Sequence, residues 1–325
     1  MRQYNILVTG VGAIIGYGIV NNLRKSRYQD YLQIIGMDIY PDAVGQAWCD
    51  DFIQAIPAAD PRYVQFVLDI MKEREIDLVM FGTEQEINRL STAKDDMGVY
   101  YQKLVLNRRE IIQLSDDKWH TFCMLQEHGF PAIPSIIEGT YQDIAEELGV
   151  PFLLKPRRSY AGKGMAVIHD ETEFSYRRSR MDADQFMVQK LIGDHDHEYT
   201  AATFGFGDGT CLEEPIVFAR KLSQEGSTAK AIRVLIPEIA QQVRELTAIL
   251  KPIGPTNYQF RKEGDQYYLL EVNPRISSST SIRAAFGYNE AEMCIDWFVN
   301  HVRPEQPIIK NGVARRYIAD WVSVE

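Results

Sequence analysis

Two neighbouring segments near the end of the chain carry polar residues that could hold a metal ion. Glu271 and Asn273 lie two residues apart in YYLLEVNPRISSS, and Gln259 lies in the preceding segment, TNYQFRKEG. If these segments form a hairpin, residues two apart point to the same side, and the three side-chain oxygens come together. Such oxygens suit Mg²⁺, which usually has few protein ligands and shares the phosphates of a substrate. Arg275 adds a positive charge on that side; a simple ion pair between Glu271 and Arg275 is the alternative interpretation.

A second group of residues is suited to binding phosphate. Lys155 ends the apolar segment PFLLK and is followed by a basic loop of small residues that contains Gly162 and Gly164. Such a loop can present ammonium and backbone N–H groups to a polyphosphate. Lys118 follows an acidic pair at the start of a predicted helix, where a lysine gains nothing from the helix dipole. Contact with a ligand would explain Lys118, and a solvated surface lysine is the alternative.

The first 107 residues must form a scaffold for these groups, because apolar strands alternate there with helices. Strands are predicted at YNILVTG, LQIIGMDIY, DFIQAIP, DLVMFGT and KLVLN, with helices at IGYGIVNNLRKS, RYVQFVLDIMKERE and QEINRLSTAKDDM. This alternation predicts a parallel, doubly wound sheet that binds ligands beyond the carboxyl ends of its strands. Gly10, Gly12, Gly16 and Asp38 are compatible with a dinucleotide site, but their spacing is not GxGxxG, and a lone motif of this kind is a weak signal.

The rest of the chain changes in character. A helix capped by Ser115 or Asp116 is predicted first. Strand and hairpin patterns follow, and an antiparallel sheet is the simplest account of them.

In order and spacing, these segments resemble the ATP-grasp superfamily, most closely one synthetase unit of the carbamoyl phosphate synthetase large subunit and its single-unit relatives. The resemblance covers nearly the whole chain, through DDK, LLKPRRSYAGKG, VQKLIG, EYT, YQF and LLEVNPRISSS followed by GY. It implies an α/β fold with a Rossmann-like pre-ATP-grasp domain and a parallel sheet at 1–107. A two-lobed α+β ATP-grasp domain with antiparallel sheets would follow, with a small lobe at 108–190 and a large lobe at 191–325.

The resemblance also implies roles for individual residues. The implied ATP-binding residues are Lys118, Lys155, Gly162, Gly164, Gln189, Lys190, Ile192 and Glu198. Among them, the two lysines would contact phosphates, residues 189–192 would form the adenine hinge, and Glu198 would hold the ribose. The implied metal ligands are Gln259, Glu271 and Asn273, which would bind two Mg²⁺ ions, with Mn²⁺ as an alternative. Arg275 and Lys155 would be catalytic, and Arg275 would stabilise charge on the transferred phosphoryl group.

The chain departs from the family pattern at two places. Ser159 and Ala161 stand where relatives often have glycine, which bears on closure of the phosphate loop. The stretch GDHDH before Glu198 is longer than usual, and an exposed turn is the preferred interpretation of His195 and His197, with metal ligation as the alternative.

By this resemblance, the protein would be a ligase that activates a small carboxylate as an acyl phosphate for attack by an amine. The segment FGTEQE would place Thr83, Glu84 and Glu86 near the amine, although Glu86 could also face water. The alternatives are an ATP-binding protein without turnover and, with less support, an NAD(P)-dependent oxidoreductase. The sequence leaves open which of four further cations face the site: Arg220, Lys221, Lys230 and Arg233.

Composition restricts the partners. Lys and Arg number 35 against 45 acidic residues, a net charge of -10, which opposes non-specific binding to nucleic acid or anionic lipid. No apolar run approaches the roughly 20 residues that span a bilayer, and no signal peptide is recognised. We therefore expect a cytoplasmic protein acting on small molecules, and a homodimer is compatible with the sequence.

Overall fold

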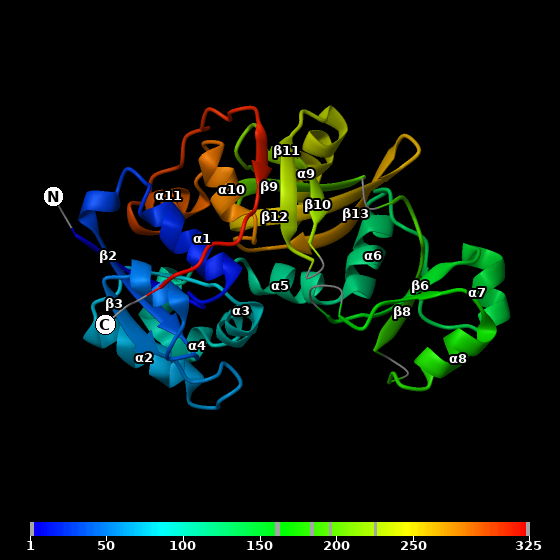
Figure 1. Cartoon of the computed structure of the whole chain (residues 1–325), viewed down its shortest axis with the longest axis horizontal. Coiled ribbons are helices and arrows are strands. Elements are labelled where there is room, and N and C mark those ends of the chain that lie inside the picture. Colours follow the sequence, from blue (N-terminus) through cyan, green and yellow to red (C-terminus); the bar gives the residue numbers. More distant parts are fainter. Residues whose placement is uncertain (1–2, 160–162, 183–184, 195–196, 224–225, 323–325) are drawn as a thin grey trace.

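The computed structural model describes residues 3–159, 163–182, 185–194, 197–223 and 226–322. Its strands form three sheets, which lie along the molecule in the order shown in Figure 1. The predicted fold class is confirmed, with a parallel N-terminal sheet followed by two antiparallel sheets. The three predicted domain boundaries stay predictions.

The N-terminal sheet has the strand order β3-β2-β1-β4 and is parallel throughout. Its strands are β1 (Tyr4–Thr9), β2 (Leu32–Asp38), β3 (Asp51–Gln54) and β4 (Leu78–Met80). One face packs on α1 (Ile14–Leu23), and the other on α2 (Tyr63–Glu73) and α3 (Glu84–Ser91). Both faces are therefore covered, as expected of a doubly wound sheet.

Two details of this region differ from the sequence predictions. The segment KLVLN makes only an isolated bridge between Leu104 and Val79, because a 3₁₀-helix at Gly98–Lys103 precedes it and α5 (Arg109–Asp116) begins soon after it. The predicted third helix is divided into α3 and a single turn, α4 (Lys94–Met97). Neither difference moves the carboxyl ends of the main strands.

The middle sheet is small and antiparallel, with the order β5-β8-β6-β7. It contains β5 (Ser135–Ile136), β6 (Phe152–Pro156), β7 (Ala166–Ile168) and β8 (Phe186–Lys190). Helices α7 (Tyr141–Leu148) and α8 (Glu171–Arg178) bury Ile144, Leu148 and Phe174 against it. This sheet carries Lys155 at the end of β6.

The largest sheet is antiparallel, with the order β13-β12-β9-β10-β11-β14. Its strands are β9 (Glu198–Phe206), β10 (Ile216–Leu222), β11 (Thr228–Arg233), β12 (Ile253–Glu263), β13 (Gln266–Asn273) and β14 (Val313–Arg315). One face packs on α9 (Pro237–Leu250) and shares a hydrophobic cluster with α5 (Arg109–Asp116) and α6 (Lys118–Glu127). These two helices thus pack on the large sheet, although they precede the small one in the chain.

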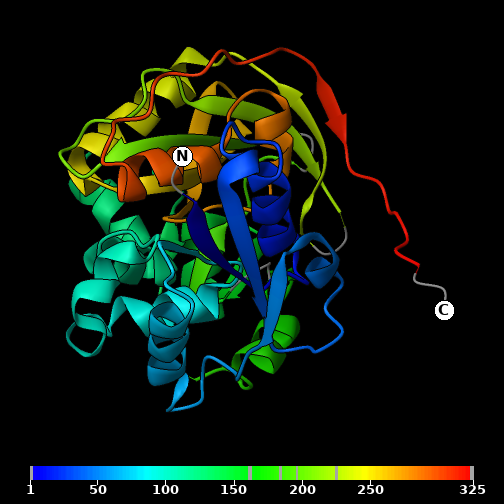
Figure 2. The same ribbon diagram turned by 90° about the vertical axis from the view of Figure 1, so that its left-hand side faces the viewer.

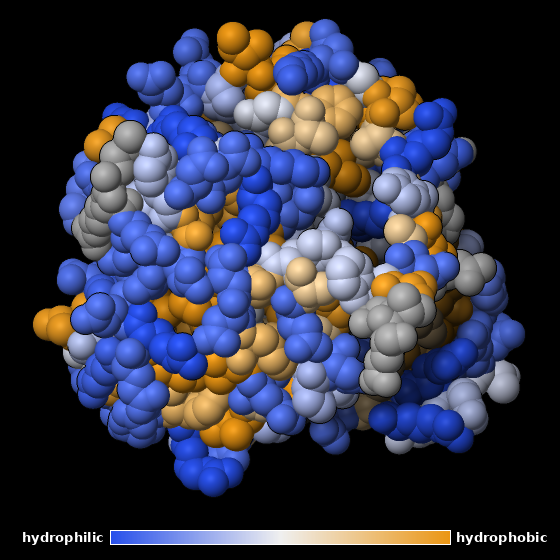
Figure 3. All heavy atoms as spheres, turned by 60° about the vertical axis from the view of Figure 1, so that its left-hand side comes forward, coloured by the Kyte–Doolittle hydropathy of each residue, from blue (hydrophilic) through white to orange (hydrophobic). Residues whose placement is uncertain are grey.

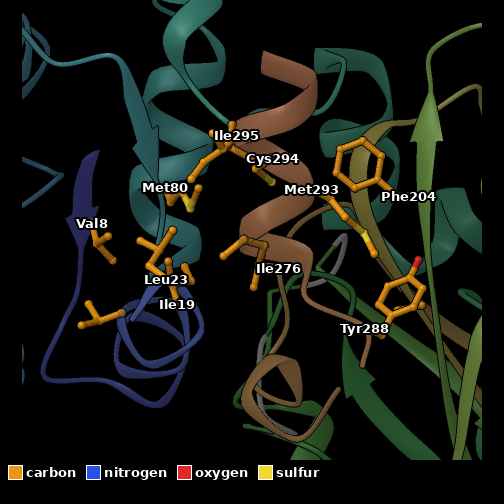
Figure 4. Close-up of a cluster of buried hydrophobic side chains, with 14 of the residues drawn as sticks. Val8, Ile19, Leu23, Met80, Phe204, Ile276, Tyr288, Met293, Cys294 and Ile295 are labelled. Carbon is orange, nitrogen blue, oxygen red and sulfur yellow. The ribbon is translucent and has the colours of Figure 1, made fainter. Parts of the chain in front are cut away.

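The other face of the large sheet packs on α10 (Thr280–Ala285) and α11 (Glu290–Cys294). Figure 4 shows that this core continues into the N-terminal sheet, because Ile276 and Ile295 lie against Leu23 and Met80. Burial of this continuous apolar surface joins the first and last parts of the chain. The cleft described below therefore rests on a shared core.

After β14 the last described residues form an extended segment (Figure 2), and the ring of Trp321 in this segment packs against Trp48, with 5.9 Å between the ring centroids. On the face shown in Figure 3, hydrophilic side chains surround separate apolar patches. Within the described ranges, none of the helices has the length and apolar character needed to cross a bilayer.

Candidate functional site

The predicted hairpin is confirmed as β12 and β13. Gln259 lies directly opposite Glu271, and Asn257 opposite Asn273. Gln259, Glu271 and Asn273 therefore point to one side of the sheet, at a β-bulge that follows Gln259. Across the described part of the chain, no group of three or more His, Cys, Asp or Glu residues could hold a metal ion. A metal at the hairpin would have one carboxylate and two amide oxygens, a set that fits Mg²⁺ completed by substrate phosphates.

Lys155 faces this hairpin from the small sheet. Its side chain is only 6% exposed, and its Nζ donates a hydrogen bond of 2.7 Å to Oε1 of Gln189. Burial lowers the pKa of Lys155 to about 7; the charges of Lys118 and Arg261 act in the same direction, and that of Glu271 opposes them. Gln189 is held in turn by the hydroxyl group of Ser135, to which it donates at 2.9 Å. The ammonium group thus has a neutral hydrogen-bond partner and like charges nearby, which suits a site for phosphate.

Lys118 lies beside the phosphate loop and is half-buried, so the interpretation as a solvated surface lysine is wrong. Its Nζ donates to the carbonyl oxygen of Ser159 at 2.7 Å and to its hydroxyl group at 3.2 Å. Burial lowers the pKa of Lys118, while Glu271 and Asp116 act in the opposite direction. Lys118 and Lys155 thus approach the hairpin from α6 and β6, although 37 residues separate them in the chain.

The cap of α6 is Asp117, so the predicted cap at Ser115 or Asp116 is wrong. Ser115 and Asp116 are the last residues of α5, and the Ser115 hydroxyl group donates back to the carbonyl of Ile111. The fully buried carboxylate of Asp117 accepts the Trp119 backbone N–H at 3.0 Å and a two-point contact from Arg157. This contact joins the start of α6 to the chain that follows β6, and so positions Lys118.

The phosphate loop is described only at its ends, and Gly162 and Ala161 lie outside the described residues. Gly164 has a φ angle of +78°, and a Cβ atom there would approach Cγ of Pro156 to 2.8 Å. The position therefore requires glycine for its backbone conformation and for the space it leaves. Ser159 accepts the hydrogen bonds from Lys118 described above.

The predicted adenine hinge lies at the end of β8. Gln189 and Ile192 are buried, and Lys190 reaches the β12–β13 hairpin, with its Nζ 3.8 Å from a carboxylate oxygen of Glu263. Nδ1 of His197 lies 2.7 Å from Oδ1 of Asp194. The His197 side chain is about half exposed, which agrees with the preferred interpretation as an exposed turn. His195 lies outside the described residues.

Glu198 is engaged by two arginines that the sequence did not assign to it. Its Oε1 accepts from Arg220 at 2.6 Å and its Oε2 from Arg261 at 2.9 Å, and its side chain is 4% exposed. Of the four cations left open, Arg220 lies in this cluster, whereas Arg233 pairs with Glu214. The sequence could not indicate the contact of Glu198 with Arg220, because this contact depends on the register between β9 and β10. The role of Glu198 at a ribose stays a prediction.

Arg275 connects the hairpin to the N-terminal region. Its Nε donates at 3.0 Å to Glu84, at the start of α3, and its Nη2 contacts both Glu84 and Oδ1 of Asn273. The alternative ion pair of Arg275 with Glu271 is thus replaced by one with Glu84. Both residues of this contact line a cleft. Its lining includes Glu84, Asn88, Asp116, Lys118, Glu271 and Arg275.

Glu86 does not face water, which corrects one of the two interpretations of its position. It is buried and accepts hydrogen bonds from the hydroxyl groups of Thr9, Tyr63 and Thr83. Burial raises its pKa, against the effect of these hydrogen bonds. Glu84 is therefore the acidic residue of FGTEQE that lines the cleft.

The opening glycines have structural roles. A Cβ atom on Gly16 would lie 2.1 Å from the carbonyl oxygen of Gly10, so glycine permits α1 to pack close to the strand end. Asp38 accepts the backbone N–H groups of Gly12 at 2.9 Å and Tyr40 at 3.1 Å. Both oxygens that a nicotinamide dinucleotide would use are thus engaged by the chain itself.

Comparisons with known proteins agree with this arrangement. A family model described as "ATP-grasp in the biosynthetic pathway with Ter operon" matches residues 213–321. The carbamoyl phosphate synthase large chain of Methanosarcina barkeri is 23% identical over 249 residues, or 67% of this chain and 22% of that protein. The chain is thus similar to ATP-grasp proteins, both over residues 213–321 and in its match to the carbamoyl phosphate synthase large chain. A C-terminal section of the Aquifex aeolicus large chain is also 23% identical, over 72% of this chain and 46% of its own length. The chain thus spans about a fifth to a half of the length of these curated relatives.

Solved structures confirm the predicted fold. N5-carboxyaminoimidazole synthetase from Staphylococcus aureus, complexed with ADP, has a TM-score of 0.74 at 19% identity, covering 95% of this chain and 81% of its own. The biotin carboxylase domain of Hydrogenobacter thermophilus 2-oxoglutarate carboxylase, with MgADP and bicarbonate, has a TM-score of 0.75 at 14% identity, covering 96% and 74%.

Proposed function

We propose that the protein is an ATP-dependent ligase that activates a small carboxylate as an acyl phosphate for attack by an amine. The observation that carries this proposal is the presence of Lys118, Glu271 and Arg275 in the lining of one cleft, where the charge of Glu271 acts on Lys118 and on the buried Lys155. Related proteins support it, since they include carbamoyl phosphate synthase and N5-carboxyaminoimidazole synthetase. The proposal includes action on small molecules in the cytoplasm, as a homodimer.

In the proposed reaction, a carboxylate oxygen attacks the terminal phosphorus of ATP, and the bond to the ADP oxygen breaks. The amine nitrogen then attacks the acyl carbon and phosphate leaves, so that an amide, ADP and phosphate are the products. Lys118 and Lys155 would hold the phosphates, and Arg275 would stabilise negative charge on the transferred group. Gln259, Glu271 and Asn273 would hold Mg²⁺ or Mn²⁺, two ions in our proposal, which neutralise phosphate charge. Glu84 would hold Arg275 in place until the anion binds.

The binding roles of Gln189, Lys190, Ile192, Glu198, Gly162 and Gly164 are also proposed. Backbone groups at the hinge would contact adenine, and the loop glycines would approach the phosphates. Each oxygen of Glu198 accepts a hydrogen bond from an arginine, and a ribose hydroxyl would share one of these oxygens with that arginine.

A test is release of ADP from ATP over a panel of small carboxylates and amines, with and without Mg²⁺. We expect one carboxylate to stimulate release, and Glu271→Gln or Arg275→Ala to reduce turnover by at least about 100-fold, the effect of losing a transition-state contact. Glu245→Gln, on the exposed side of α9, is the matched control and should retain full activity. Full activity of either site variant would refute the metal and transition-state roles. Nucleotide binding without stimulation by any carboxylate would instead favour a non-catalytic ATP-binding protein.

A further inference from the structure

Arg220 is a buried cation that the proposed reaction does not use. It lies on β10, opposite Glu198 on β9, and Glu198 lies opposite Arg261 on β12. Its side chain is 6% exposed, and its Nη2 donates to Glu198 at 2.6 Å and to Oε1 of Gln259 at 2.5 Å. Arg220 thus reaches across a whole strand to one of the proposed metal ligands.

One edge of the Arg220 guanidinium is suited to an anion. Within the described residues, its Nε is buried and has no hydrogen-bond partner, while Nη2 alone makes the contacts to Glu198 and Gln259. The N–H groups of Nε and Nη2 are parallel, so this edge matches the two oxygens of a carboxylate or phosphoryl group. Five other arginines also have a buried Nε without a partner among the described residues: Arg89, Arg108, Arg233, Arg261 and Arg283. The Arg220 edge differs from them because its Nη2 contacts Gln259, a proposed metal ligand.

Metal binding and the contact of Arg220 with Gln259 compete for the same oxygen. A divalent ion at Oε1 of Gln259 would lie beside Nη2 of Arg220, and the two positive charges would repel each other. When the metal binds, Nη2 therefore loses one acceptor and becomes free to form the second half of the two-point contact.

The surroundings of Gln259 are rich in positive charge. The cations there are Arg220, Arg261 and Lys155, and the facing carboxylates are Glu198 and Glu271. The positive charge of Arg261 contributes to the lowered pKa of Lys155. When Lys155 is protonated, these cations outnumber the two carboxylates by one, which favours a bound anion.

We propose, on the basis of the ligase function above, that Arg220 binds the oxyanion of a reacting group once a magnesium ion has taken the oxygen of Gln259. The oxyanion is either the carboxylate substrate or the terminal phosphoryl group of ATP, which share the required pair of oxygens. Arg220 is then a substrate-binding residue, contributed by β10 on the side of the hairpin opposite Arg275.

The test compares Arg220→Lys, which keeps the charge and loses the two-point edge, with Arg233→Lys. Arg233 is also a buried arginine paired with one glutamate, on the adjacent strand β11, and serves as the matched control. Calorimetry would measure the affinity for Mg·ADP and for the magnesium complex of the β,γ-imido analogue of ATP, which is not hydrolysed. It would also measure the affinity of the Mg·ADP-bound protein for bicarbonate or acetate. Thermal unfolding would verify that each variant folds.

For Arg220→Lys, we expect Mg·ADP affinity within about threefold of the wild type. The affinity for one of the two anions should fall about tenfold, which is typical of a lost charge-assisted contact. A loss confined to the imido analogue assigns the phosphoryl group, and a loss confined to bicarbonate or acetate assigns the carboxylate. Both affinities within about twofold of the wild type, as expected for Arg233→Lys, would overturn the inference.

A second variant tests the inference if Arg220→Lys does not fold. Gln259→Leu removes the competing oxygen, so without Mg²⁺ it should bind inorganic phosphate about fivefold more tightly than the wild type. Equal affinity would overturn the inference. Because these are binding measurements, they still decide the role of Arg220 if the wild type binds nucleotide without turnover, a result that contradicts only the ligase. A wild type without nucleotide affinity would overturn both.

Discussion

Binding of a nucleotide to this cleft should take up a proton through Lys155. Burial lowers the pKa of Lys155 to about 7, so at pH 8 the amine is mostly neutral in the nucleotide-free protein. Each pKa unit corresponds to about 1.4 kcal/mol, so the charged form is disfavoured by roughly 5 kcal/mol relative to water. Nucleotide phosphates favour the ammonium form and would restore its proton.

The magnitude follows from this pKa. If phosphate raises the pKa of Lys155 to about 9, nucleotide binding at pH 8 takes up about 0.8 proton, and affinity falls about sixfold per pH unit near pH 8. The stability of the nucleotide-free protein should change in the opposite direction as the pH rises. Between about pH 7 and 10, the unfolded chain binds a proton that the folded chain lacks, so the free energy of unfolding rises with pH by up to about 1.4 kcal/mol per unit.

Calorimetry of Mg·ADP binding in two buffers of different ionisation enthalpy measures the proton uptake directly. Lys155→Met keeps the side-chain length and removes the titration, so proton uptake should disappear and affinity should become nearly independent of pH. Lys94→Met, at an exposed lysine of α4, is the control and should retain the uptake of the wild type. Wild-type affinity that is equal at pH 7.5 and 8.5, or undiminished uptake in Lys155→Met, would refute the reasoning.

Two further predictions concern backbone geometry and the buried core beneath the cleft. Gly164→Ala should lower nucleotide affinity and destabilise the protein by about 1–3 kcal/mol, because φ is positive there and the new Cβ would collide with Pro156. Binding measurements report the affinity, and thermal unfolding reports the stability. Affinity and stability equal to those of the wild type would contradict the steric argument. Arg283 and Glu290 are both fully buried and pair at 3.0 Å, so Arg283→Met alone should cost about 3–5 kcal/mol by leaving an unpaired charge. Adding Glu290→Gln should recover part of that loss in chemical denaturation, and no recovery would contradict the assignment to buried charge.

Much of the site could be predicted from the sequence because its motifs are local. The hairpin of β12 and β13 has a short turn and alternating residues, so the relative positions of Gln259 and Glu271 follow from pairing along a few residues. The position of Lys155 at the end of an apolar strand was equally readable. Its neighbour Lys118 required the family resemblance, since an isolated lysine at a helix start is usually solvated.

Contacts between distant segments could not be predicted in this way. The attachment of Arg275 to Glu84 joins residues 191 positions apart, and the contact of Arg220 with Gln259 depends on β9 lying between their strands. No local pattern encodes such pairings. The cap of α6 at Asp117 also depended on tertiary structure, because α5 continues through Ser115 and Asp116 and the Asp117 carboxylate meets Arg157.

The sequence by itself determined which groups are present and how they alternate along each strand: an acidic and amide hairpin, two lysines and a glycine-containing loop. These properties depend on side-chain chemistry and on the period of two residues in a strand. Only the tertiary structure decided which charges meet. It buried Lys155, placed Glu198 between two arginines and directed Arg275 to Glu84. The physical reason is that charge interactions and desolvation depend on distances in space, which are set by the packing of three sheets and not by positions along the chain.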